Sequence, residues 1–97
     1  MKTLYVIVHK DLIEKRMWDE PTAAEIYAAL GDLPRDQSIE IESHMSARLI
    51  HPNMPKPSDG LEIVVCGAAR GICVQNQYEL LRDQGYKVKI NEDLCVY

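Results

Sequence analysis

A cysteine at the start of an expected helix is the side chain best suited to chemistry in this sequence. Cys73 follows the run Gly67-Ala68-Ala69-Arg70-Gly71, whose small residues let the backbone approach a bound molecule closely. The amide groups and the dipole of a helix start favour a thiolate over a thiol, and they can hold the oxyanion formed when a thiolate attacks a carbonyl. Cys73 is therefore a candidate nucleophile. The alternative is a small apolar side chain packed at a helix start.

Two titratable residues follow the first apolar run of the chain, where a base for such a thiol would be needed. His9 comes directly after the run at 4–8, and Asp11 stands two residues later. Either side chain is chemically able to act as a general base. Asp11 is also a candidate N-cap for a short helical turn. Both residues remain candidates at this stage.

The turn before Cys73 also offers groups that could bind a substrate. Arg70 can pair with an anionic substrate or product, and Gly67 and Ala68 leave room for it. Of the other two cysteines, we expect Cys66 to be structural and Cys95 to be a spectator thiol or an interface residue. No Cys-x-x-Cys pair is present, so we expect no structural zinc site. The sequence suggests no metal ligands and no cofactor.

The hydrophobic pattern predicts alternating strands and helices that would position these residues. Continuous or alternating apolar residues indicate strands, and apolar residues three and four apart indicate helices. The expected strands are 4–8, 38–43 (at a sheet edge), 61–66 and 86–90, and the expected helices are 22–30 and about 71–84. Thr22 and Glu25 form a capping box at the start of the first helix. Residues 44–60 contain three prolines and are expected to form a long loop.

This order of elements predicts the α/β class, with a small and mostly parallel sheet of about four strands. Strands that alternate with helices favour parallel pairing through right-handed crossovers. The 97 residues fit a single domain of the three-layer, Rossmann-like type. Ligands of such sheets bind outside the carboxyl ends of the strands, which is where the run 67–73 is expected.

A family resemblance is carried by the apolar strand and helix start Ile63-Val64-Val65-Cys66-Gly67-Ala68-Ala69-Arg70-Gly71-Ile72-Cys73-Val74. It continues through Gly85-Tyr86-Lys87-Val88 and Glu92-Asp93. This arrangement resembles the isochorismatase-like cysteine hydrolases, which include the nicotinamidases. Their pattern is an apolar strand, Cys-Gly-Val-Ala-Thr-x-x-Cys-Val, a helix, Gly-Phe/Tyr-x-Val and a Glu/Asp-Asp step. The match covers residues 61–94, in a truncated chain of about half the family's usual length.

The resemblance implies that Cys73 is the nucleophile and that the Ala68–Ala69 peptide is cis. It implies an oxyanion hole made by the amides of Ala69 and Cys73, a small amide substrate such as nicotinamide, and a homo-oligomer. Family members place an aspartate base at the end of the first strand, where this chain has Val8. Family members also use a lysine from a central strand. The candidates for its counterpart in this chain are Arg35, which is expected in a turn, and Lys56, which is in the proline-rich loop.

Composition narrows the remaining classes of function. The net charge is −4 and no basic run is present, which argues against nucleic-acid binding. No apolar run is long enough for a membrane span, and three unpaired cysteines favour a reducing cytoplasm. We therefore expect a reduced cysteine hydrolase acting on a small amide or ester. The alternative is an inactive α/β module that binds a small anionic or nucleotide-like ligand or a protein partner. A site shared by two chains is a further possibility.

Overall fold

The computed structural model of the chain describes residues 2–15, 23–69 and 71–96. The elements are β1 (Lys2–Val8), α1 (Lys10–Lys15), α2 (Ala23–Gly31), η1 (Arg35–Gln37), β2 (Ser38–Ile41), β3 (Leu61–Ala68), α3 (Cys73–Asp83) and β4 (Lys87–Val96). Two helices and a short 3₁₀ turn separate the first two strands, β2 and β3 are joined by a loop, and one helix separates β3 from β4.

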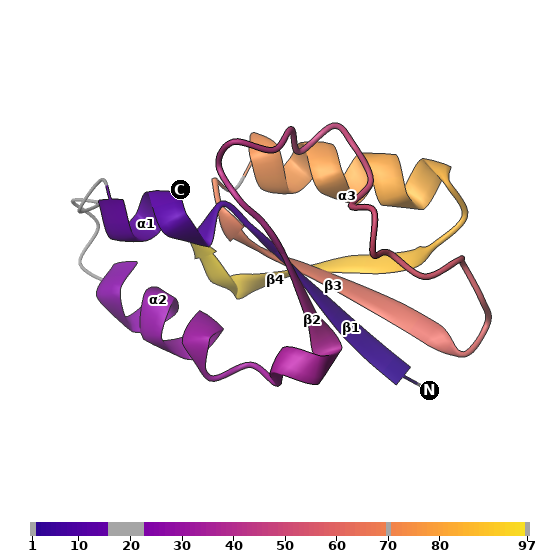
Figure 1. The fold of residues 1–97 in the computed structure, drawn as a ribbon, viewed down its shortest axis with the longest axis horizontal. Coiled ribbons are helices and arrows are strands. Elements are labelled where there is room, and N and C mark those ends of the chain that lie inside the picture. Colours follow the sequence, from indigo (N-terminus) through magenta and orange to yellow (C-terminus); the bar gives the residue numbers. More distant parts are fainter. Residues whose placement is uncertain (1, 16–22, 70, 97) are drawn as a thin grey trace.

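The four strands form one parallel sheet in the order β2-β1-β3-β4. In the two central strands Val6 of β1 lies beside Val65 of β3, and on its other side Val6 pairs with Ile39 of the edge strand β2. Because all strands run the same way, their carboxyl ends meet at one edge of the sheet (Figure 1). The predicted α/β class is confirmed, and so is the edge position of β2.

α3 covers one face of the sheet, and α1 and α2 pack near the carboxyl ends of the strands on the other side (Figure 1). Alternate residues of a strand point to opposite faces, so the two helical layers pack on different residues of β1 and β3. Buried Val74 and Leu81 of α3 belong to the hydrophobic core on one side, and Ile26 and Leu30 of α2 belong to it on the other. The resulting core is almost wholly aliphatic.

The strands β3 and β4 both run further than the sequence predicts. β3 continues through Gly67 to Ala68, and β4 continues to Val96, because the two strands resume pairing after a shift in register. Cys95 therefore lies in the sheet beside Gly67 and is only 3% exposed. Cys95 is therefore a buried residue of the sheet, and its expected role as a spectator or interface thiol stays a prediction.

Gly67 allows the close approach of β3 to the end of β1. Its φ is +113°, and a Cβ atom built on it would lie 2.2 Å from the carbonyl oxygen of Val8. No other residue combines this backbone conformation with so little volume. The glycine therefore sets the spacing of the two central strands where they reach the carboxyl edge.

The helices differ from prediction mainly at their ends. The predicted stripe of α2 is present, with Ala23, Ile26 and Leu30 buried and Tyr27 half-buried. The capping residue Thr22 lies outside the described residues. α3 begins at Cys73 instead of Gly71, and its third fully buried residue is Gln77, while Tyr78 is only half-buried.

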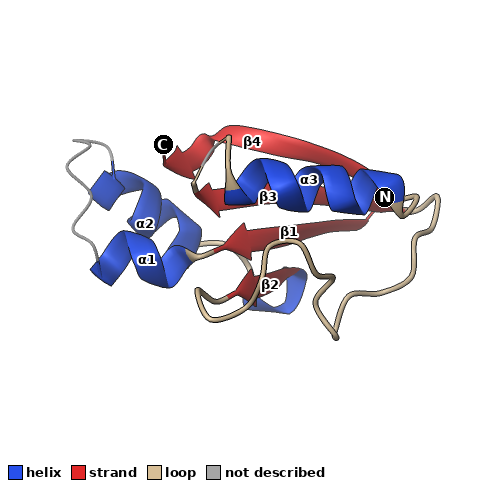
Figure 2. Ribbon diagram, turned by 90° about the horizontal axis from the view of Figure 1, so that it is seen from above, coloured by secondary structure: helices blue, strands red, loops and turns tan. Residues whose placement is uncertain are grey.

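The segment 42–60 contains no helix or strand, as its prolines predict. It runs alongside α3 and returns to β3 at the other end of the molecule (Figures 1 and 2). The hydroxyl of Tyr86 donates a hydrogen bond to the carbonyl of Pro55, and Gln77 binds two further carbonyls of the segment. Within the described part of the chain, no helix is long and apolar enough to cross a membrane.

Candidate active site

The ends of β1 and β3 and the start of α3 meet at the carboxyl edge of the sheet (Figure 2). Cys73 is the first residue of α3 and is half-buried, with its side chain packed against the core. No side chain of the described residues caps this helix start, and its first turn contains no acidic residue. The positive end of the α3 dipole is therefore not neutralised by its own helix, which favours a negatively charged group there.

The backbone amides around Cys73 differ in their hydrogen bonding among the described residues. Ile72 and Val74, the neighbours of Cys73, both donate their amides to the carbonyl of Ala69, at 3.1 and 3.2 Å. Among the described residues the amide of Cys73 has no acceptor. The Ala68–Ala69 peptide is cis, as the resemblance implies. The predicted use of the Ala69 amide as a second oxyanion donor stays a prediction.

His9 is buried directly after β1, with only 6% of its surface exposed. Its backbone has a φ of +53°, and its amide donates to the carbonyl of Ile41. The imidazole Nε2 lies 3.1 Å from the carbonyl oxygen of Met45. Because a carbonyl only accepts, Nε2 must carry the proton, and the lone pair of neutral His9 is then on Nδ1. That atom is buried and has no hydrogen-bond partner among the described residues.

Asp11 contacts the loop after β2 and does not cap a helix, while its role as a general base stays a prediction. Its carboxylate accepts hydrogen bonds from the backbone amide of Ser43, at 3.0 Å, and from the Ser43 hydroxyl. It lies within the first turn of α1, which begins at Lys10, so it is not the N-cap of that helix. The interpretation of Asp11 as an N-cap is wrong. The tertiary fold instead brings the carboxylate to the loop that follows β2.

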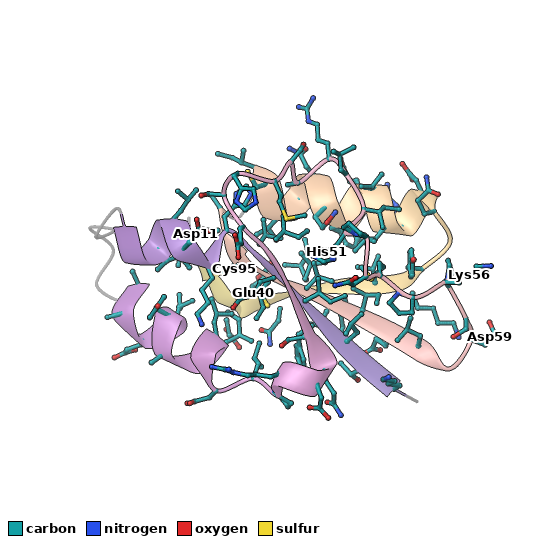
Figure 3. The ribbon with its side chains drawn as sticks, in the orientation of Figure 1. Asp11, Glu40, His51, Lys56, Asp59 and Cys95 are labelled. Atoms are coloured by element: carbon teal, nitrogen blue, oxygen red, sulfur yellow. The ribbon has the colours of Figure 1, made fainter. Side chains whose placement is uncertain are left out.

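The structure does not bring all of the candidate residues together. Within the described part of the chain, no hydrogen bond joins the Cys73 thiol to His9 or to Asp11. Val8, at the position of the family's aspartate, is fully buried among apolar side chains. Lys56 is exposed at the opposite end of the molecule from Asp11 (Figure 3). Arg70 lies outside the described residues.

The other two cysteines are buried and unsuited to nucleophilic chemistry. Cys66 has no exposed surface, and its thiol lies 3.7 Å from the carbonyl oxygen of Val6. Burial raises the pKa of Cys66 to about 12, with a smaller contribution from the neighbouring Cys95. Of the three thiols, only that of Cys73 is partly exposed, so it is the one available to a substrate.

Gln77 is the site residue that reasoning from the sequence missed. Its side chain is completely buried, and its amide nitrogen donates to the carbonyls of Ala47 and Leu49, at 3.2 and 3.4 Å. A signal was present, because Gln77 falls between Val74 and Leu81 on the apolar stripe of α3. A polar residue at such a position must find partners from another part of the chain.

No group of three or more potential metal-ligating side chains occurs among the residues that the structure describes. Comparison of the chain with protein-family models, curated proteins and solved structures found no match. The class of protein is therefore described from its fold and its site. The chain is a small parallel α/β protein that carries a half-buried cysteine at a helix start and a buried histidine at the same sheet edge.

Proposed function

We propose that this protein is a cysteine hydrolase that cleaves a small amide or ester, with Cys73 as nucleophile and His9 as general base. The observation that carries the proposal is the hydrogen bonding of His9, since the Met45 carbonyl fixes the proton on Nε2 and leaves Nδ1 as a buried free acceptor. A histidine held in this way by a third group is ready to accept a proton from a nearby thiol. The start of α3 supplies the complementary positive potential at Cys73.

The chemistry would run through a thioester. Nδ1 of His9 takes the thiol proton as the Cys73 sulfur attacks the substrate carbonyl, and the amide of Cys73 holds the resulting oxyanion. When the tetrahedral intermediate collapses, the amine or alcohol leaves with the proton from His9. Water, deprotonated by His9, then attacks the thioester and releases the acid and the free thiol. By the family resemblance, the substrate is a small amide such as nicotinamide and the reducing cytoplasm keeps the thiol free.

His9 is a better base than Asp11 in this arrangement. Both carboxylate oxygens of Asp11 accept hydrogen bonds from Ser43, whereas His9 keeps one unpartnered nitrogen. Hydrogen bonds of catalytic groups are often long before substrate binds, so closure of the gap between His9 and Cys73 belongs to the substrate complex.

The proposal is tested by acylation of the thiol. The protein is mixed with p-nitrophenyl acetate at pH 7, nitrophenol release is followed, and peptide mass spectrometry locates the acetyl group. We expect acetylation of Cys73 and none in Cys73→Ala. His9→Ala should slow acylation by about 100-fold, which is the usual contribution of a general base. Asp11→Asn should change it by only a few-fold.

Cys95→Ala is the matched control, because it removes a thiol that is buried at the same edge. Acylation should persist in this variant. The proposal fails if the acetyl group is found on no cysteine, or if Cys73→Ala acylates as fast as the parent. Turnover of nicotinamide, measured as ammonia release, then tests the substrate class.

The second candidate function is an inactive α/β module that binds a small anionic or nucleotide-like ligand at the same helix start. The absence of a hydrogen bond to the Cys73 thiol among the described residues favours it, as does the apolar Val8 at the end of β1. Its probe is titration of the ¹⁵N-labelled protein with inorganic phosphate and with AMP. Shifts of the Ala69, Cys73 and Val74 amides that persist in Cys73→Ala, together with no acylation of the parent, would favour this function over hydrolysis.

A further inference from the structure

The loop after β2 is bound at every second residue by polar side chains from other elements. We call residues 43–49 the strap. The Asp11 carboxylate of α1 accepts a hydrogen bond from Ser43, and the His9 ring donates one to the carbonyl of Met45. The Gln77 amide of α3 donates to the carbonyls of Ala47 and Leu49. These partners come from 28 to 36 residues away in the sequence. The strap is therefore fixed by tertiary contacts along its whole length.

Gln77 is an unusual residue for the interior of this helix face. It has no exposed surface, and its Oε1 atom has no hydrogen-bond partner within the described part of the chain. Leaving such an oxygen buried and unpaired destabilises the folded state. A leucine of similar volume would avoid that cost. The property that only the glutamine supplies is its NH₂ group, which reaches two strap carbonyls at once.

Gln77 stands one helical turn after Cys73. Residues four apart lie on the same face of a helix, so the strap contacts α3 on the face that also carries the thiol. The strap carbonyl that orients His9 belongs to Met45, two residues before Ala47. One face of α3 thus bears both the nucleophile and the anchor of the segment that orients the base.

We infer that Gln77 is a positioning residue of the site, which holds the strap so that the Met45 carbonyl keeps the His9 proton on Nε2 and the lone pair on Nδ1. This inference rests on the proposed function, because the role of the lone pair is to accept the Cys73 proton. Without the two Gln77 hydrogen bonds, the strap is free to move away from His9. The imidazole then populates its other tautomer, in which Nδ1 carries the proton and cannot act as a base.

The tautomer of His9 is the direct readout, and it needs no substrate. Long-range ¹H–¹⁵N correlation spectra of the ¹⁵N-histidine-labelled protein at pH 7.5 distinguish the two neutral forms. The parent should show His9 almost entirely as the Nε2–H form. In Gln77→Leu at least about a fifth of His9 should shift to the Nδ1–H form, and acylation of Cys73 should slow at least about tenfold.

Two controls accompany this variant. Gln75→Leu removes a glutamine that binds only Glu79 on the exposed side of α3, and it should leave the tautomer and the acylation unchanged. His51 is an internal control. Its Nδ1 accepts a hydrogen bond from the backbone amide of Asn53, so its tautomer should not change when Gln77 is replaced.

The outcomes separate the inference from the proposed function. An unchanged His9 tautomer in folded Gln77→Leu overturns the inference, even if the parent acylates. If the His9 tautomer shifts in Gln77→Leu but the parent is not acylated, Gln77 does control the His9 tautomer, and the proposed hydrolase function is contradicted. If Gln77→Leu does not fold, Gln77→Met replaces it with the same readout, because methionine keeps the length of the side chain and lacks the NH₂ group. An unchanged His9 tautomer in that variant equally overturns the inference.

Discussion

Cys66 shows at the scale of one residue how the sheet suppresses the chemistry of a thiol. Its side chain has no exposed surface, and burial raises its pKa to about 12 from an ordinary value of 9.0. The folded protein therefore keeps this thiol neutral at pH values where the unfolded chain ionises it. The same residue type at position 73 is only half-buried, because it lies at a helix start at the edge of the sheet.

This difference predicts how stability depends on pH. Below pH 9 the thiol is neutral in both states, so its contribution is complete. As the pH rises from 9 toward 12, the unfolded chain loses the proton first, and the free energy of unfolding falls by up to about 1.4 kcal/mol per pH unit. Urea unfolding of the parent and of Cys66→Ala between pH 8 and 10.5 measures this. The parent should lose stability more steeply, and parallel curves would contradict the burial effect.

At the scale of elements, the long loop between β2 and β3 is ordered by side chains that lie outside it. Its first part, the strap, is held by Asp11, His9 and Gln77. Its second part is held by two side chains. The Tyr86 hydroxyl donates a hydrogen bond to the backbone carbonyl of Pro55, and the Lys87 ammonium donates one to the backbone carbonyl of Asp59. A proline-rich segment with few backbone hydrogen bonds of its own relies on such contacts for a fixed path.

Removal of the tyrosine hydroxyl tests the second part of the loop. Tyr86→Phe loses the hydrogen bond to Pro55 and should lower the free energy of unfolding by about 1 kcal/mol. Amide hydrogen exchange of residues 53–60 should also become faster. Tyr78→Phe is the matched control, because the Tyr78 ring packs beneath Arg82 on α3 and its hydroxyl has no hydrogen bond among the described residues. Equal effects of both substitutions would argue against an anchoring role for Tyr86.

At the scale of the whole molecule, one aliphatic core spans both faces of the sheet. Leu81 of α3 is fully buried on one face, and Leu30 of α2 is 2% exposed on the other. Both belong to the same contiguous cluster of buried residues. A protein of this size gains most of its stability from a single cooperative core of this kind.

We therefore expect Leu81→Ala and Leu30→Ala each to lower the free energy of unfolding by about 2–5 kcal/mol. Each variant should still unfold in one transition in urea, followed by circular dichroism. Leu49→Ala, at a position that is 67% exposed, should change stability by less than about 0.5 kcal/mol. Two separate transitions in either core variant would mean that the two helical layers are not one cooperative unit.

Much of the fold is determined by residues close together in the sequence. The apolar run at 61–66, the alternation at 38–43 and the stripe of Ala23, Ile26 and Leu30 each indicate the element that is present, because periodicity follows from local backbone geometry. β2 ends at Ile41, two residues before its predicted end. The same local reasoning predicts Cys73 at a helix start and a long loop after β2.

The tertiary structure alone decided the partners of the polar side chains. Asp11 binds Ser43 at a separation of 32 residues, His9 binds Met45 at 36 and Gln77 binds Ala47 at 30. The extension of β3 and β4 past their predicted ends likewise needed their mutual pairing. Hydrogen bonds over such separations depend on how whole elements pack, which no short window of sequence contains. Local patterns thus sufficed for the scaffold and the position of Cys73, whereas the roles of His9, Asp11 and Gln77 required the packed fold.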